Sequence, residues 1–136
     1  MSSEENKNLV RRYQAAYNQN DLDALHELID PDILTPKIYP GLPPGLEGAK
    51  AVHRIALLGM PDFHTEIEDL IAEEDKVVAR VTISGTHSGT FFGIPATGKK
   101  VKFTGMYLVR IKNGKIVEHW GEEDGISLMQ QLGILK

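Results

Sequence analysis

The residue types best suited to chemistry gather near the C-terminus, where three carboxylates, Glu122, Glu123 and Asp124, follow the single tryptophan, Trp120. If the strand around Trp120 stays regular, Asp124 lies on the same face as the indole, because side chains alternate along a strand. The indole would then supply an apolar wall, and removing a carboxylate from water makes it a stronger base. Such a base is suited to taking a proton from a carbon next to a carbonyl group.

Asp124 also fits a structural role, because it directly precedes Gly125, where a closing helix is expected to begin. Aspartate is a preferred N-cap residue, since its side chain accepts a hydrogen bond from the first turn of the helix. Spacing alone favours the cap over the base. The two roles stay open at this point.

The histidines are a second set of candidate groups. His119 has the opposite strand parity to Trp120, so a regular strand places it on the other face, as a surface or interface histidine. It would reach a substrate oxygen, as a catalytic donor, only if a β-bulge intervened. His53, His64 and His87 fall on different expected elements and show no HxH or HxxxH spacing. We therefore predict no metal site, and we expect His53 and His87 to line a pocket, with a structural role as the alternative for His87.

Aromatic side chains are the third set. Tyr13 and Tyr17 share the inward stripe of the first expected helix, where a tyrosine either bonds a ligand or ends a core side chain with a polar tip. Phe91 and Phe92 lie in a glycine-rich connection and either cover the core or form the rim of an apolar pocket. The residues predicted to line a substrate pocket are Trp120, Tyr13, Tyr17, Phe63, His87, Phe91, Phe92, Phe103, Tyr39 and His53.

Two helices are expected at the start of the chain. Ser2 and Glu5 fit a capping box that opens the first, and its apolar period continues to Tyr17. The second is short, over 21–29. It ends at Asp30-Pro31, because a residue before proline avoids helical dihedral angles.

The stretch from 33 to 59 is less regular. Pro36 confines a possible strand over 33–38 to the edge of a sheet. The segment 39–48 holds three prolines and three glycines and is predicted to be an ordered loop. A third helix is expected over 47–59.

From Phe63 the apolar period changes from that of a helix to that of a strand. Strands are expected from 63 to a turn at 73–75, and over 76–87, 101–112 and 115–121, with a closing helix over 125–133. Asn113-Gly114 is a strong hairpin signal, across which Arg110 is expected to pair with Glu118.

Helices followed by antiparallel strands predict an α+β fold, in one domain over 1–136. A long antiparallel sheet of this kind curves strongly, and helices laid across its hollow face leave a cone with an apolar pocket. The exposed face of such a sheet needs a cover, so a homodimer that pairs sheet to sheet is expected. Val78, Val117 and His119 are the candidates for that face.

Composition excludes several classes of function. The net charge of −4 and the lack of a basic block argue against a nucleic-acid partner. Cysteine is absent, which removes disulfides and thiolate chemistry. The acidic start MSSEENKN is not expected to act as a signal peptide, and no apolar run approaches the roughly 20 residues that a membrane span needs. A cytoplasmic protein with no membrane partner is expected.

Three segments carry a family resemblance: YQAAYNQNDLDALHELIDPD, GMPDFHTEIEDLIAEEDKVVARVTISGTHSGTFFGIPATGKKV and RIKNGKIVEHWGEEDGISLMQQLG. With them the chain resembles the SnoaL-like polyketide cyclases, in the nuclear transport factor 2-like superfamily of cone-shaped α+β proteins. The resemblance implies a cavity enzyme without a metal or redox cofactor. It also implies that one buried aspartate, matching Asp124, removes an activated C–H proton so that an enolate closes a ring.

The leading hypothesis is therefore cofactor-free acid–base chemistry on a small hydrophobic carbonyl compound, with Asp124 as base and acid. A non-catalytic module for ligand binding or dimerisation is one alternative. An isomerase or hydrolase on the same scaffold is another, because a fold alone does not determine a reaction.

Overall fold

The computed structural model of the chain describes residues 2–35 and 40–136. Its elements are α1 (Ser3–Asn18), α2 (Leu22–Leu28), β1 (Ile29–Leu34), α3 (Gly45–Gly59), β2 (His64–Glu73), β3 (Lys76–Thr86), β4 (Lys100–Lys112), β5 (Lys115–Glu123) and α4 (Gly125–Gln131). Helices followed by a run of strands and a closing helix confirm the expected α+β order. None of the helices in the described ranges is long and apolar enough to cross a membrane.

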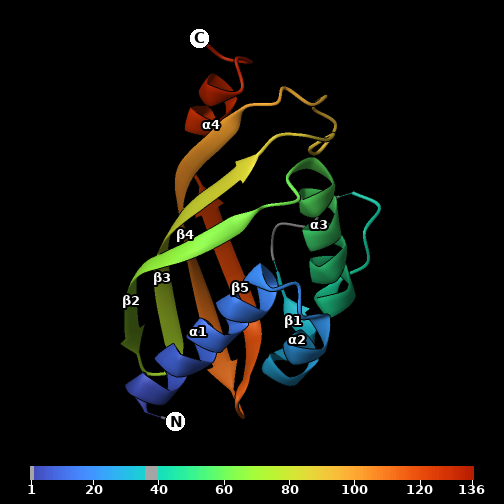
Figure 1. Cartoon of the computed structure of the whole chain (residues 1–136). Coiled ribbons are helices and arrows are strands. Elements are labelled where there is room, and N and C mark those ends of the chain that lie inside the picture. The colour runs from blue at the N-terminus through green and yellow to red at the C-terminus, as the bar shows by residue number, and fades with distance from the viewer. Residues whose placement is uncertain (1, 36–39) are drawn as a thin grey trace.

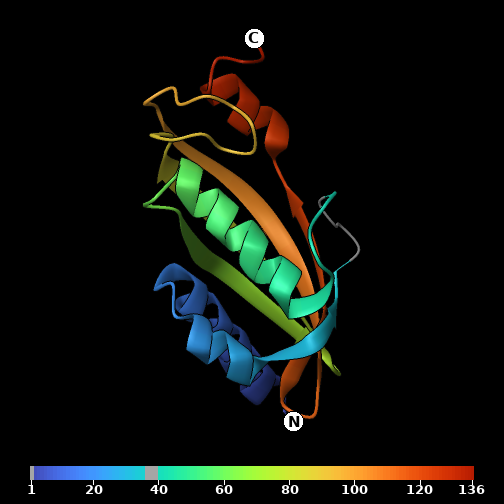
Figure 2. The same ribbon diagram turned by 90° about the vertical axis from the view of Figure 1, so that its right-hand side faces the viewer.

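The five strands form one curved, open sheet in the order β1-β5-β4-β3-β2. The helices α1, α2 and α3 lie against one face of it, and α4 stands at the end of β5 (Figures 1 and 2). Neighbouring strands from β2 to β5 are antiparallel, whereas β1 runs parallel to β5. The sheet is therefore mixed, and the expectation of a purely antiparallel sheet was wrong at this edge.

The edge strand also begins earlier than expected. Ile29 is 1% exposed and lies opposite Ile116 of β5, so it opens β1 instead of ending a helix. Pairing with a distant strand has overridden the local helical pattern, and Pro31 is tolerated because β1 is an edge strand. Part of the strand expected over 33–38, and Tyr39 with it, lies outside the described residues.

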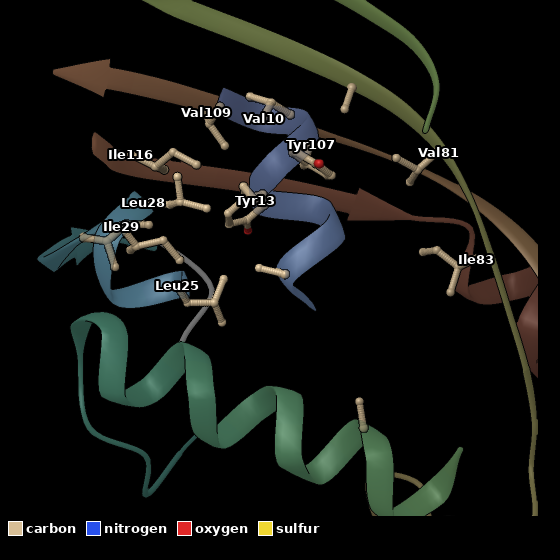
Figure 3. Packing of buried hydrophobic residues seen from close by; sticks show 14 of the residues in the cluster. Val10, Tyr13, Leu25, Leu28, Ile29, Val81, Ile83, Tyr107, Val109 and Ile116 are labelled. Atoms are coloured by element: carbon tan, nitrogen blue, oxygen red, sulfur yellow. The ribbon is translucent and has the colours of Figure 1, made fainter. Parts of the chain in front are cut away.

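Alternate residues of β3 and β4 point inward and pack under the helices. Figure 3 shows Tyr13 of α1 beside Tyr107 of β4, with Val81 and Ile83 of β3 further along the same face. Burial alternates along β3, which confirms the strand periodicity expected over 76–87. This inward face is the wall on which the site is built.

Two predicted polar contacts are also present. Ser2 and Glu5 form the reciprocal capping box of α1. The Arg110 guanidinium donates through Nε to Glu118 at 2.8 Å and through Nη1 to Asp75 at 3.0 Å. The hydrogen bond from Arg110, followed by one from Trp120, holds the pKa of the Glu118 carboxyl below its usual value.

Candidate active site

A cavity of about 680 Å³ lies between the helices and the inward face of the sheet and is partly open to solvent. This volume is within the usual range for small-molecule sites, and the lining is mostly apolar. Of the residues predicted to line a pocket, the structure brings together Tyr13, Tyr17, His53, Phe63, Phe91, Phe92 and Trp120 around this cavity, and His119 joins them.

A β-bulge in β5 decides which side chains face the cavity. Ile116 pairs with Ile111, but Glu118 pairs with Arg110, so Val117 is an extra residue in the ladder. The bulge shifts the strand parity by one, and His119 therefore faces inward opposite Val109. A position on the outer, interface face was the wrong expectation for His119.

The same shift turns Trp120 outward. The residue is 48% exposed, and its indole Nε1–H donates to Glu118 at 2.6 Å, although Trp120 still contributes to the cavity lining. The expectation that Trp120 would wall off Asp124 on one face was therefore wrong. A regular strand was assumed, and the bulge at Val117 breaks that regularity.

His119 lies in an aromatic environment. Its ring is stacked on Tyr107 at 5.2 Å between centroids and is tilted against Tyr13 at 6.3 Å. A side chain at Gly121, two residues along the same face, would come within 3.2 Å of this imidazole, so glycine makes room for it. Burial lowers the pKa of His119 to about 4, and the imidazole is therefore uncharged at neutral pH, with one N–H to donate.

His119 and three tyrosines form what we call the aromatic cluster. Its members are Tyr13, Tyr17, Tyr107 and His119. Tyr13 and Tyr17 meet edge to face at 5.0 Å. Burial raises the pKa of Tyr17 to about 12 and raises the pKa values of Tyr13 and Tyr107 as well. The cluster therefore offers uncharged hydroxyl and imidazole donors and no fixed charge.

The cluster has polar supports that the sequence did not reveal. The buried Tyr107 hydroxyl donates to Gln14 Oε1 at 3.0 Å. His53 packs edge-on against Tyr17 at 5.0 Å, and its Nε2 lies 3.1 Å from Asn20 Oδ1. Burial, followed by the nearby Arg54, lowers the pKa of His53. Gln14 sits on the inward face of α1, but a polar residue there carries no signal of its partner 93 positions away.

The three acidic residues after Trp120 form what we call the carboxylate rim: Glu122, Glu123 and Asp124. All three are exposed, and Glu122 and Glu123 line the cavity. Glu123 pairs with Gly105, and a side chain at Gly105 would come within 3.2 Å of the Glu123 Cγ. Glycine at that position leaves room for Glu123 on the cavity face of the sheet.

Asp124 is the N-cap of α4. Its Oδ1 accepts a hydrogen bond from the Ser127 N–H at 3.0 Å, and its side chain is exposed and absent from the cavity lining. The expected burial of this carboxylate was therefore wrong. The strand ends at Glu123 and the helix begins at Gly125, so the junction turns Asp124 toward the first turn of α4. Its neighbours on both sides line the cavity, and its catalytic role stays a prediction.

Two predicted pocket residues lie elsewhere. His87 is completely buried, with Nδ1 2.9 Å from Thr97 Oγ1 and Nε2 3.2 Å from the Ile94 carbonyl oxygen. It holds the connection after β3 together and does not line the cavity, which agrees with the structural alternative. Phe103 is a core residue at 4% exposure, also outside the cavity lining.

His64, the third histidine considered for a metal site, is exposed and lies 3.2 Å from Glu66. Within the described ranges, no three His, Asp or Glu side chains gather in a way that could hold a metal ion.

The cavity thus combines two kinds of polar group on one strand. His119 and Glu123 face the same side of β5, and four residues of strand span about 13 Å. One substrate atom cannot touch both, so uncharged donors and carboxylates would act on different parts of one elongated ligand.

The sequence profile of the SnoaL-like polyketide cyclases matches residues 7–132. Aklanonic acid methyl ester cyclase DnrD of Streptomyces peucetius is 33% identical over 129 residues, which cover 92% of this chain and 88% of that protein. Nogalonic acid methyl ester cyclase of Streptomyces nogalater is 31% identical over 124 residues, covering 88% and 90%. The solved structure of TsrD from Streptomyces laurentii superposes with a TM-score of 0.89 at 32% identity and covers 99% of both chains. The chain therefore belongs to the SnoaL-like polyketide cyclase family, whose nuclear transport factor 2-like α+β fold it shares.

Proposed function

We propose that this protein closes a ring in a hydrophobic polyketide ester by an intramolecular aldol reaction. The observation that carries the proposal is the lining of the cavity, because it combines carboxylates with uncharged hydrogen-bond donors. The similarity to two methyl ester cyclases supports the same reaction class.

The chemistry needs only proton transfer. A carboxylate at the rim takes a proton from the carbon between or beside carbonyl groups, and the resulting enolate carbon attacks a ketone of the same molecule. The alkoxide that forms takes the proton back from the carboxylic acid. Substrate and product are isomers, so the reaction is redox-neutral and requires no electron acceptor.

The aromatic cluster would orient the far end of the substrate. Tyr17 and His119 are uncharged at neutral pH, so each can donate a hydrogen bond to a carbonyl or hydroxyl oxygen. Such an anchor fixes the reacting carbon at the rim, and correct placement of reacting groups supplies a large part of an enzyme's rate advantage.

Asp124 is the proposed base, and Glu123 is its competitor. The family resemblance points to Asp124, which stands at the rim between two cavity-lining residues. An apolar substrate that fills the cavity would cover this carboxylate and remove it from water, which strengthens a base. Glu123 already faces the cavity, so Glu123→Gln separates the two assignments.

The test is turnover of aklanonic and nogalonic acid methyl esters, followed by chromatography for a product of unchanged mass. Asp124→Asn is expected to lower kcat/KM by about 100-fold or more, the usual contribution of a general base. Asn caps helices as well as Asp does, so the fold is kept. Asp21→Asn is the matched control, because Asp21 caps α2 in the same way at 3.1 Å. Full activity of Asp124→Asn, or loss only in Glu123→Gln, rejects Asp124 as the base.

One observation favours a second candidate, a ligand-binding protein without turnover. The Asp124 carboxylate is already engaged as a helix cap. This candidate predicts that the esters bind in the cavity but are recovered unchanged, at the same affinity in wild type and Asp124→Asn.

We also propose a homodimer that pairs the outer faces of two sheets. Leu108 pairs with Trp120 on that face, and Met106 and Trp120 are 51% and 48% exposed. Val78 pairs with Leu108 and belongs to the same surface, whereas His119 does not. Light scattering after size exclusion tests this, and a monomer at every concentration contradicts it.

A further inference from the structure

The connection between β3 and β4 contains an aromatic residue in a backbone conformation that aromatic residues avoid. Phe92 has φ +47° and is followed by Gly93 at +84°. Two consecutive positive φ values are the signature of a type I′ turn, which favours Asn-Gly. The chain has such a turn at Asn113-Gly114, with φ +53° and +74°. A left-handed conformation is unfavourable for a bulky side chain.

The surroundings hold this turn firmly. Phe91 and Ile94 exchange two backbone hydrogen bonds of 2.9 Å, which close the hairpin around Phe92-Gly93. His87, buried beneath, bonds the Ile94 carbonyl through Nε2. Phe91 lies directly on Gly59, the last residue of α3, where a side chain would collide with it. Backbone strain persists only where the structure around it over-determines the conformation.

The strained residue faces the candidate site. Phe92 lines the cavity, is half-buried, and its ring meets Phe91 edge to face at 4.7 Å and 81°. Strained residues of this kind gather at ligand clamps. An aromatic ring held rigidly at a cavity wall is a stacking surface for a flat ligand.

We infer that Phe92 is a specificity-determining residue that selects flat, conjugated substrates over flexible chains of similar size. The inference rests on the proposed function, because it concerns the substrate of the same cavity. It adds that the hairpin over 91–94 is built to present this ring, with His87 as a positioning residue beneath it.

The test compares two neutral esters of similar size, methyl naphthoate and methyl decanoate, by titration calorimetry. Wild type is expected to prefer the naphthoate. Phe92→Leu keeps an apolar side chain but removes the ring, and is expected to weaken naphthoate binding about five-fold, a typical aromatic-pair contribution. Its decanoate affinity is expected to stay within two-fold.

Two further variants serve as controls for the role of the Phe92 ring. Phe92→Asn recreates the favoured Asn-Gly turn, so it keeps the hairpin and is expected to lose the aromatic preference as well. Phe63→Leu makes the matched change at another half-buried phenylalanine of the cavity lining, one without positive φ, and is expected to keep the preference.

The inference is overturned if Phe92→Leu loses affinity equally for both esters or loses none. It is also overturned if wild type binds neither ester or shows no preference between them. The same change of selectivity in Phe63→Leu would overturn it as well. Binding is measured without turnover. A failure of Asp124 as base therefore leaves this result unaffected, and the reverse also holds.

Discussion

The aromatic cluster and the carboxylate rim share one cavity but differ in their contact with water. Tyr13 and Tyr107 are buried, Tyr17 and His119 are half-buried, and all four are uncharged at neutral pH, whereas Glu122, Glu123 and Asp124 are exposed. In the proposed mechanism, this difference assigns substrate binding to one end of β5 and proton transfer to the other. Ionising a donor that is removed from water costs free energy, so the donors of the cluster stay uncharged. An exposed carboxylate becomes a strong base only when a substrate covers it.

The largest effect on stability is expected when a carboxylate is placed in the aromatic cluster and a histidine is placed in the carboxylate rim. His119→Glu places a carboxylate in the aromatic cluster and is expected to lower the free energy of unfolding by about 3 kcal/mol at neutral pH. The reciprocal change at the rim, Glu122→His, is expected to stay within about 0.5 kcal/mol. Urea unfolding measures both, and equal costs would show that the cluster is not a dry region.

The titration of His119 tests whether the aromatic cluster keeps its imidazole uncharged in the folded protein. Its pKa is about 4 in the folded protein against an ordinary value of 6.5, so between these pH values the unfolded chain binds a proton that the folded protein does not. Stability is therefore lost as the pH falls through this window, by roughly 2 kcal/mol. His119→Gln should flatten this part of the profile in urea unfolding at a series of pH values. An unchanged slope would contradict the buried, neutral imidazole.

A smaller effect is expected at the support of the cluster. Tyr107→Phe leaves the buried Gln14 carbonyl without its donor and is expected to cost about 1.5 kcal/mol. Adding Gln14→Met removes the orphaned acceptor, so the double variant should be more stable than the sum of the single changes predicts. If the stability losses of the two single variants add up to that of the double variant in thermal unfolding, the Tyr107–Gln14 hydrogen bond contributes nothing to stability.

Much of the fold could be predicted from the sequence because its signals are local. The alternation of Val77, Ala79 and Val81 marks β3, and Asn113-Gly114 marks the hairpin between β4 and β5. The parallel pairing of β1 could not be predicted, because it depends on a partner strand more than eighty residues away.

The sequence predicted many of the residues that line the candidate site, but not the direction in which the side chains of β5 face. Tyr13, Tyr17 and Phe92 do line one cavity. The bulge at Val117 has no glycine or proline to signal it, yet it exchanges the faces of His119 and Trp120. At Asp124 two roles competed, and the helix-cap geometry is present while the base role stays a prediction.

Rescue of Asp124→Gly by formate tests whether a carboxylate at position 124 transfers the proton. Glycine caps a helix nearly as well as aspartate, and it opens the exposed rim to a small carboxylate. If this carboxylate is the base, Asp124→Gly is expected to turn over the methyl esters at least about 100-fold more slowly, and formate is expected to restore its activity in a saturable manner while leaving Asp21→Gly unchanged. A folded Asp124→Gly that works at the wild-type rate, or that formate does not restore, would contradict this role.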